Sequence, residues 1–273
     1  MSAVSMHRLS PALSRFVSGL HYFEADDDSP PELERILPGG NVHLMVNLHE
    51  DEFRIYEGAD YSEVRRSGGA VLEGAASRAR VIDTGLQRNL ICVDFSLGGA
   101  AAFFNLPVSE AQDSLVDLDQ LWGRDGALVR ERLLEARTPD SKLLLLHDLL
   151  VEHLAARDAP DRAVRSAASL LEQGVSIADA ASRVGLLSKT LNRRFQALIG
   201  LTPKRFARVR RLQRVLGSLG ALHEVDWVET AIAHGFADQA HLIHDFHDLT
   251  GLTPTAYRSR SPESQNHVPV HSA

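Results

Sequence analysis

A duplicated segment in the last hundred residues constrains the fold more than any other feature of this sequence. In each copy a glycine is followed by a leucine, a phenylalanine and then the tetrapeptide Gly-Leu-Thr-Pro; the first copy begins at Gly185 and the second at Gly235. From the leucine onward, the matched positions lie 51 residues apart. Such self-similarity at a fixed offset indicates that one structural unit occurs twice.

Each copy fits two short helices joined by a tight turn. In the first copy we expect one helix over residues 177–184 and a second over residues 188–199, with Leu191 and Phe195 on its inner face. Gly185 separates the two helices, because glycine readily adopts the left-handed conformation found where helices end. The pattern is typical of a helix-turn-helix, although a plain helical bundle also contains helices separated by glycine.

The same signals give the boundaries of the helical part. A Thr-Pro pair commonly begins a helix, so the segment after Gly-Leu-Thr-Pro should be helical as well. The sequence predicts a first helix-turn-helix at about residues 175–200, a linker helix over 203–219 and a second helix-turn-helix at about 226–251. We expect an all-α domain over residues 161–260 and a flexible tail over residues 261–273.

Charge is distributed unevenly along the chain. The net charge is −7, made up of −11 on residues 1–160, +9 on residues 161–220, −4 on residues 221–260 and −1 on the rest. A basic segment within an acidic chain suits a polyanion-binding region attached to another domain. The positive charge belongs to the first repeat and the linker helix.

The first 158 residues have a different pattern. Alternation of apolar and polar residues predicts strands over residues 41–48, 52–57, 70–72, 79–82 and 89–95. After residue 127, leucines at helical spacing predict helices. We therefore expect a β-rich (α+β) domain over residues 1–158 that ends in helices, with the domain boundary at Asp158–Pro160.

The duplicated segments resemble the DNA-binding domain of AraC/XylS-type bacterial transcription regulators. The second copy, GFADQAHLIHDFHDLTGLTPTAYR at residues 235–258, is similar to the signature stretch of that family nearly throughout. The first 158 residues are a looser match, in which Leu37–Leu44 and Val93–Ala100 resemble segments of sensor domains found on some of these regulators. The resemblance implies a multi-domain α and β protein with two helix-turn-helix subdomains joined by a linker helix.

The resemblance also implies a function. We expect a sequence-specific transcription regulator that reads successive major grooves of double-stranded promoter DNA with two recognition helices. A small-molecule effector at the N-terminal domain, a homodimer, and RNA polymerase in the case of an activator would be further partners. No residues are assigned to effector binding. The alternative is a protein-interaction adaptor or antagonist with a degenerate second helix-turn-helix, because the second copy is acidic.

Helical geometry indicates which side chains of the first copy face DNA. With Leu191 turned to the core, the outward and flanking positions are Lys189, Thr190, Asn192, Arg193 and Gln196. Lysine and arginine pair with guanine in the major groove, and asparagine and glutamine pair with adenine. The family pattern places recognition at Lys189, Asn192 and Arg193. On an isolated helix the same residues would be interpreted as solvated surface charges.

Further DNA contacts are expected outside this helix. The candidates for phosphate contact, which positions a protein without reading sequence, are Arg205, Arg208 and Arg211. The candidates in the second copy are Gln239, His241 and His244. Because this copy has histidines where the family often has arginine and lysine, and three aspartates on the same helix, we expect it to contribute fewer contacts.

Several classes of function are disfavoured. We expect no metal and no cofactor, because one helix face could hold only two of the three histidines of the second copy and no carboxylate-supported site accompanies them. The single cysteine, Cys92, lies in an apolar strand. No nucleophile, phosphate-loop or dinucleotide motif is evident, so we expect no enzyme and no catalytic residues. The longest apolar run, Ala100–Phe104, is far too short to span a membrane. We expect a cytoplasmic protein.

Overall fold

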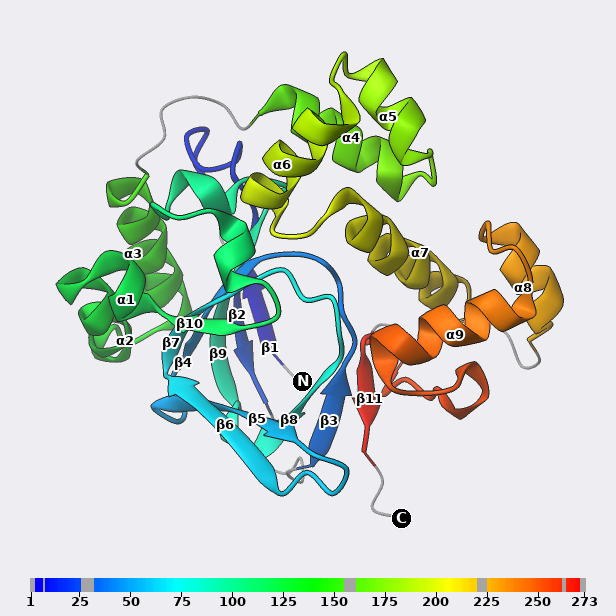
Figure 1. Cartoon of the computed structure of the whole chain (residues 1–273). Helices are drawn as coiled ribbons and strands as arrows, with labels where there is room; N and C mark the ends of the chain where they lie inside the picture. Colours follow the sequence, from blue (N-terminus) through cyan, green and yellow to red (C-terminus); the bar gives the residue numbers. More distant parts are fainter. Residues whose placement is uncertain are drawn as a thin grey trace.

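The computed structural model describes residues 3–6, 8–25, 32–154, 161–219, 225–261 and 264–270 (Figure 1). Its N-terminal part is β-rich and its C-terminal part is helical, which confirms the expected fold class. The domain boundary predicted at Asp158–Pro160 lies outside the described residues. None of the described helices is both long and apolar enough to cross a bilayer.

Two antiparallel sheets make up the N-terminal part. The first has the strand order β1-β2-β9-β4-β7-β10, formed by Ala3–Met6, Val17–Glu24, Asn89–Phe95, His43–Asn47, Ala70–Glu73 and Leu115–Asp117. The second has the order β11-β3-β8-β5-β6, formed by His267–Pro269, Leu33–Ile36, Arg80–Asp83, Glu52–Glu57 and Glu63–Gly68. Short 3-10 turns lie at Thr84–Leu86, Ala100–Ala102, Val108–Ala111 and Pro254–Ala256.

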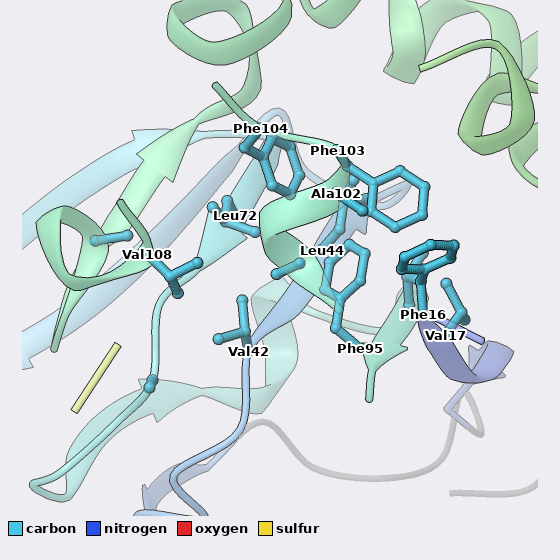
Figure 2. Close-up of a cluster of buried hydrophobic side chains, with 14 of the residues drawn as sticks. Phe16, Val17, Val42, Leu44, Leu72, Phe95, Ala102, Phe103, Phe104 and Val108 are labelled. Atoms are coloured by element: carbon cyan, nitrogen blue, oxygen red, sulfur yellow. The ribbon is translucent and has the colours of Figure 1, made fainter. Parts of the chain in front are cut away.

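The alternation seen in the sequence places one face of the first sheet in the core. Leu44, Val46, Ile91 and Val93 are fully buried, because residues two apart on a strand point to the same side. Helices α1 (Leu118–Trp122), α2 (Arg124–Glu135) and α3 (Pro139–Glu152) pack on this sheet. Figure 2 shows the aromatic part of this core, where Phe95, Phe103 and Phe104 meet above the strands.

The C-terminal part consists of six described α-helices. Their bounds are α4 Arg162–Glu172, α5 Ile177–Arg183, α6 Ser188–Ile199, α7 Pro203–Leu219, α8 Trp227–Ala233 and α9 Gln239–Thr250. The two helix pairs α5–α6 and α8–α9 are the predicted repeats, and α6 and α9 lie toward opposite ends of α7 (Figure 1). Gly185 and Gly235 have φ values of 69° and 74°, so both turns use the left-handed region available to glycine.

The two parts share a continuous apolar core. One hydrophobic cluster runs from strand residues such as Leu20 to Phe195 and Phe206 of the helical part. At the centre of this contact, Gly200 ends α6 with φ 92° and faces Ala75 and Val108 of the N-terminal part. The first helix-turn-helix and the linker helix are therefore packed against the N-terminal part.

Residues 264–270, in the described part of the C-terminal segment, differ from the sequence expectation of a flexible tail. His267–Pro269 form strand β11, which pairs with β3 at the edge of the second sheet. The side chain of Glu34 on β3 is 1% exposed and makes ion pairs with Arg260 and with His267, whose Nδ1 lies 2.8 Å away. These contacts order the segment because they satisfy both an unpaired strand edge and a buried carboxylate.

Candidate DNA-binding surface

The second helix of the first repeat, α6, presents the predicted recognition residues on its outer side. Lys189, Asn192 and Arg193 are exposed, and Thr190 and Gln196 are half-buried. On the opposite side, Leu191 and Phe195 are fully buried. The rotation of α6 about its axis is therefore the one predicted from the sequence.

The cations of α6 divide into two groups. Arg194 forms an ion pair with Asp161, which also caps the N-terminus of α4 through the amides of Ala163 and Val164. Arg194 therefore fixes α6 to α4. Lys189 and Arg193 take part in none of the ion pairs found among the described residues, so both cations remain available to a polyanion.

The three predicted phosphate contacts are placed differently from the expectation. Arg205 donates from Nε to Ser77 Oγ of the N-terminal part at 2.6 Å. Arg208 makes ion pairs with Asp245 at 2.8 Å and Asp248 at 2.7 Å. The sequence alone does not predict these pairings, because the partners are far away in the sequence and no local pattern signals them.

Arg211, the last of the three, is also occupied within the protein. It forms an ion pair with Asp245 at 2.6 Å and lies 4.0 Å from the centre of the Phe236 ring. In this structure, all three arginines donate to protein groups rather than to open solvent, because acidic or polar partners lie within reach of α7 on both sides.

Asp245 is the centre of this pairing. Its side chain is buried, and burial opposes its ionisation, but the hydrogen bonds and charges of Arg208 and Arg211 outweigh burial and hold the pKa of the carboxyl below its ordinary value. The two aspartates on either side of Asp245 in the sequence also have structural partners. Asp248 pairs with Arg208, and Asp238 caps α9 by accepting from the His241 amide at 2.7 Å. The acidity of this repeat thus has a structural explanation.

The second recognition helix, α9, offers fewer groups to DNA. Gln239 and His244 are exposed, as the sequence predicted. His241 is half-buried, packs edge-on against Phe236, and has Nε2 3.3 Å from Nη2 of Arg211. His241 is therefore placed to support the junction of α9 with α7 more than to reach a base.

An open groove separates the two helix-turn-helix units. It has a volume of about 800 Å³, and its polar lining includes Lys204, Arg208, Arg211, Arg214, His244, Asp245 and Asp248. Arg214 donates to the carbonyl of Glu172 at 2.5 Å and so fixes the C-terminal end of α4. Lys204 is exposed and has no ion pair with any described residue.

A second cavity, of about 440 Å³, lies in the N-terminal part. Its charged and phenolic lining consists of Arg35, Tyr56, Glu57, Tyr61, Arg65, Glu73, Arg78, Arg80 and Asp113. Arg35 links this cavity to the second repeat, since its guanidinium donates both to the hydroxyl of Tyr61 at 2.7 Å and to the carbonyl of Thr250 at 2.9 Å.

Comparison with protein families gives two matches. Residues 180–260 match the family described as a helix-turn-helix domain, and this confirms over these residues the resemblance inferred from the duplicated segments. Residues 7–117 match a domain of unknown function, DUF6597. No curated protein matches the chain in sequence.

Solved structures of ToxT from Vibrio cholerae are similar to this chain at low identity. One, with an unsaturated fatty acid bound, has a TM-score of 0.44 and 11% identity, and the match covers 92% of this chain and 96% of that one. Another, bound to (E)-4-(8-methylnaphthalen-1-yl)but-3-enoic acid, has a TM-score of 0.45 and 12% identity over 87% of this chain and 96% of that one. A third, from strain O395, has a TM-score of 0.41 and 12% identity over 84% and 96%.

Proposed function

We propose that this protein is a sequence-specific DNA-binding transcription regulator, because residues 180–260 match a helix-turn-helix family and the duplicated segments resemble AraC-type DNA-binding domains. The observation that carries the proposal is the outer face of α6, where Lys189, Asn192 and Arg193 are exposed together. Arginine and lysine pair with the guanine acceptors of the major groove, and asparagine pairs with adenine. The second repeat would enter the next major groove about one helical turn, roughly 34 Å, further along the same DNA face.

The two recognition helices are proposed to contribute unequally. The cations near α9, Arg208 and Arg211, are neutralised by aspartates, whereas Lys189 and Arg193 on α6 are not. The first repeat would therefore provide most of the phosphate attraction and the main base contacts. Gln239 and His244 would supply polar contacts from the second repeat.

The test is an alanine substitution on α6 with a charge-matched control. Promoter fragments retained by the protein are first identified by sequencing, and affinity for that site is then measured for Arg193→Ala and Arg165→Ala. Arg165 is also exposed but lies on α4, outside the helix-turn-helix. We expect Arg193→Ala to weaken binding by about 1–3 kcal/mol and to relax specificity in one half-site.

The control and the salt dependence distinguish the outcomes. Arg165→Ala should lower affinity little and leave the specificity unchanged. A loss in Arg193→Ala that is the same for every DNA sequence would mean that Arg193 touches only phosphate. If wild type shows no sequence-specific retention even at low salt, where phosphate contacts are strongest, the regulator function is wrong and a protein-interaction adaptor is favoured.

We also propose that the N-terminal part holds a small-molecule effector in the 440 Å³ cavity. This volume lies in the usual range for ligand sites, roughly 300–1,000 Å³. Arg65 pairs with Glu57 and Arg80 with Glu73, which leaves Arg78 as a lining cation with no ion pair to any described residue, and this favours a polar or anionic compound. Arg35 connects the lining to the end of α9. A thermal-shift screen of small carboxylates, repeated on Arg78→Ala, tests this step: a stabilising compound whose effect survives that substitution would place its site elsewhere.

A further inference from the structure

Four side chains with metal-binding chemistry meet on one face of the first sheet. His21 lies on β2, His43 on β4, and Cys92 and Asp94 on β9. The strand register sets His21 opposite Cys92 and His43 opposite Asp94, so all four point to the side away from the buried leucines and valines. All four are half-buried, unlike their fully buried neighbours along each strand.

Three of these residues bring their donor atoms together. His43 Nδ1 lies 2.7 Å from Asp94 Oδ1, Cys92 Sγ lies 3.5 Å from the same oxygen, and Sγ lies 3.9 Å from Nδ1. Around a tetrahedral zinc ion the corresponding separations are about 3.3 Å for nitrogen to oxygen and about 3.5 Å for sulfur to either. The His43–Asp94 separation has to open by about 0.6 Å, as a hydrogen bond is replaced by two bonds to a metal, and the Cys92–His43 separation has to close by about 0.4 Å.

His21 is not one of the three residues whose donor atoms meet, but it contacts Asp94, which is. Its Nε2 lies 2.9 Å from Asp94 Oδ2, the carboxylate oxygen that does not face His43. Carboxylates that ligate metals are commonly held by such a hydrogen bond. Gly19, two residues earlier on β2, gives the imidazole room, because a Cβ there would collide with His21 Nε2.

We propose that His43 Nδ1, Cys92 Sγ and Asp94 Oδ1 bind one divalent transition-metal ion, with zinc as the best match, and that His21 positions Asp94. A mixed nitrogen, sulfur and oxygen set suits zinc or cobalt, whereas calcium and magnesium require oxygen ligands. The thiol proton leaves to solvent on coordination, so the thiolate and the Asp94 carboxylate together balance the two charges of the ion. The nearby cation Arg80 is paired with Glu73 and adds no uncompensated charge. Three protein ligands leave the fourth coordination position of a tetrahedral ion open to water or to a small ligand.

No local spacing in the sequence predicts this site, because its residues come from three strands. Their juxtaposition depends on the register of β2, β4 and β9, which spans residues 21 to 94. The site is separate from the helix-turn-helix surface, so its test does not depend on DNA binding.

Cobalt titration of the reduced, metal-free full chain tests the proposal directly. We expect one Co²⁺ per chain, with a sulfur-to-cobalt charge-transfer band in the near ultraviolet, intense tetrahedral bands in the visible, and displacement by Zn²⁺. Cys92→Ser, His43→Gln and Asp94→Asn should each lose the bands, and His21→Gln should weaken binding by about 10–100-fold. His49→Gln, on the adjacent exposed turn, and His244→Gln, on α9, should bind as wild type does.

A measurement without substitutions covers the case in which a variant fails to fold. Zn²⁺ should raise the Tm of the wild-type chain and slow the alkylation of Cys92 by iodoacetamide. Loss of binding in His244→Gln instead would place the metal on α9 and overturn the proposal. So would the absence of a thiolate band, unchanged alkylation, or no saturation of wild type below millimolar Co²⁺.

Discussion

At the scale of single residues, Asp245 holds the linker helix to the second recognition helix. Its buried carboxylate accepts hydrogen bonds from Arg208 and Arg211, which lie three residues apart and therefore on one side of α7. Replacing it by asparagine keeps the volume but removes the charge that both guanidinium groups face. We expect Asp245→Asn to lower the free energy of unfolding by about 1–3 kcal/mol, measured by denaturant titration. Asp248→Asn, at an exposed partner of Arg208, should change it by less than about 0.5 kcal/mol.

The effect of Asp245 should depend on pH with a defined sign. Its folded-state pKa is below the ordinary value, so its contribution to stability is present above the ordinary aspartate pKa of about 3.9. The contribution is lost as the pH falls from there through the lower folded value. The difference between wild type and Asp245→Asn should therefore narrow below about pH 4. A difference that stays constant from neutral to strongly acidic pH would mean that packing, not charge, is responsible.

Single residues also show what could be predicted of the candidate site. Exposure of Lys189, Asn192 and Arg193 follows from helical period alone once Leu191 is placed in the core. The helical period does not predict partners: the sequence makes Arg205 and Arg208 candidates for phosphate contact, whereas the fold provides Ser77 and Asp245 as their partners. The direction of a side chain follows from the local helical period, whereas the residue that it contacts depends on the tertiary fold.

At the scale of elements, the glycines that end helices differ in what surrounds them. Gly185 and Gly200 both have positive φ, but a Cβ at Gly185 would meet nothing within 4 Å. A Cβ at Gly200 would lie 3.1 Å from Ala75 Cβ and 3.2 Å from Val108 Cγ1. We expect Gly185→Ala to cost about 1–2 kcal/mol from backbone strain alone, and Gly200→Ala to cost more because the N-terminal part must also shift. Equal losses in denaturant titrations of the two variants would contradict this.

Whether an element depends on its own sequence pattern or on a distant partner explains which elements the sequence could predict. Helix α7 and strands β5 and β9 have the bounds expected from their periodic patterns. Strand β6, EVRRSG, has no apolar alternation and is mostly exposed, so its pairing with β5 decides its structure. Strand β11 is three residues long and depends on β3, more than two hundred residues earlier. Elements stabilised by distant partners leave little local signal.

At the scale of the whole molecule, the N-terminal part and the linker helix share a polar contact beside their common core. Ser77 is fully buried, and its hydroxyl lies 2.6 Å from both Asp113 Oδ2 and Arg205 Nε. Arg210 and Gln213 of α7 donate to the carbonyls of Gly39 and Pro38 in the N-terminal part. The helix that joins the two helix-turn-helix units is thus also the helix that the N-terminal part holds.

Two adjacent cations at the start of α7, Lys204 and Arg205, allow the contact with the N-terminal part to be tested separately from DNA binding. Lys204 is exposed in the groove between the two helix-turn-helix units, whereas Arg205 is directed to Ser77. We expect Lys204→Ala to reduce the salt slope of DNA binding by about 1, as the loss of one phosphate contact does, with stability unchanged. Arg205→Ala should leave the salt slope unchanged and lower the free energy of unfolding by about 1–2 kcal/mol, because the buried Ser77 hydroxyl loses its donor and Asp113 loses a nearby positive charge. Salt titrations of DNA affinity and denaturant titrations on both variants measure this. A reduced slope with unaltered stability in Arg205→Ala would return that arginine to the DNA surface.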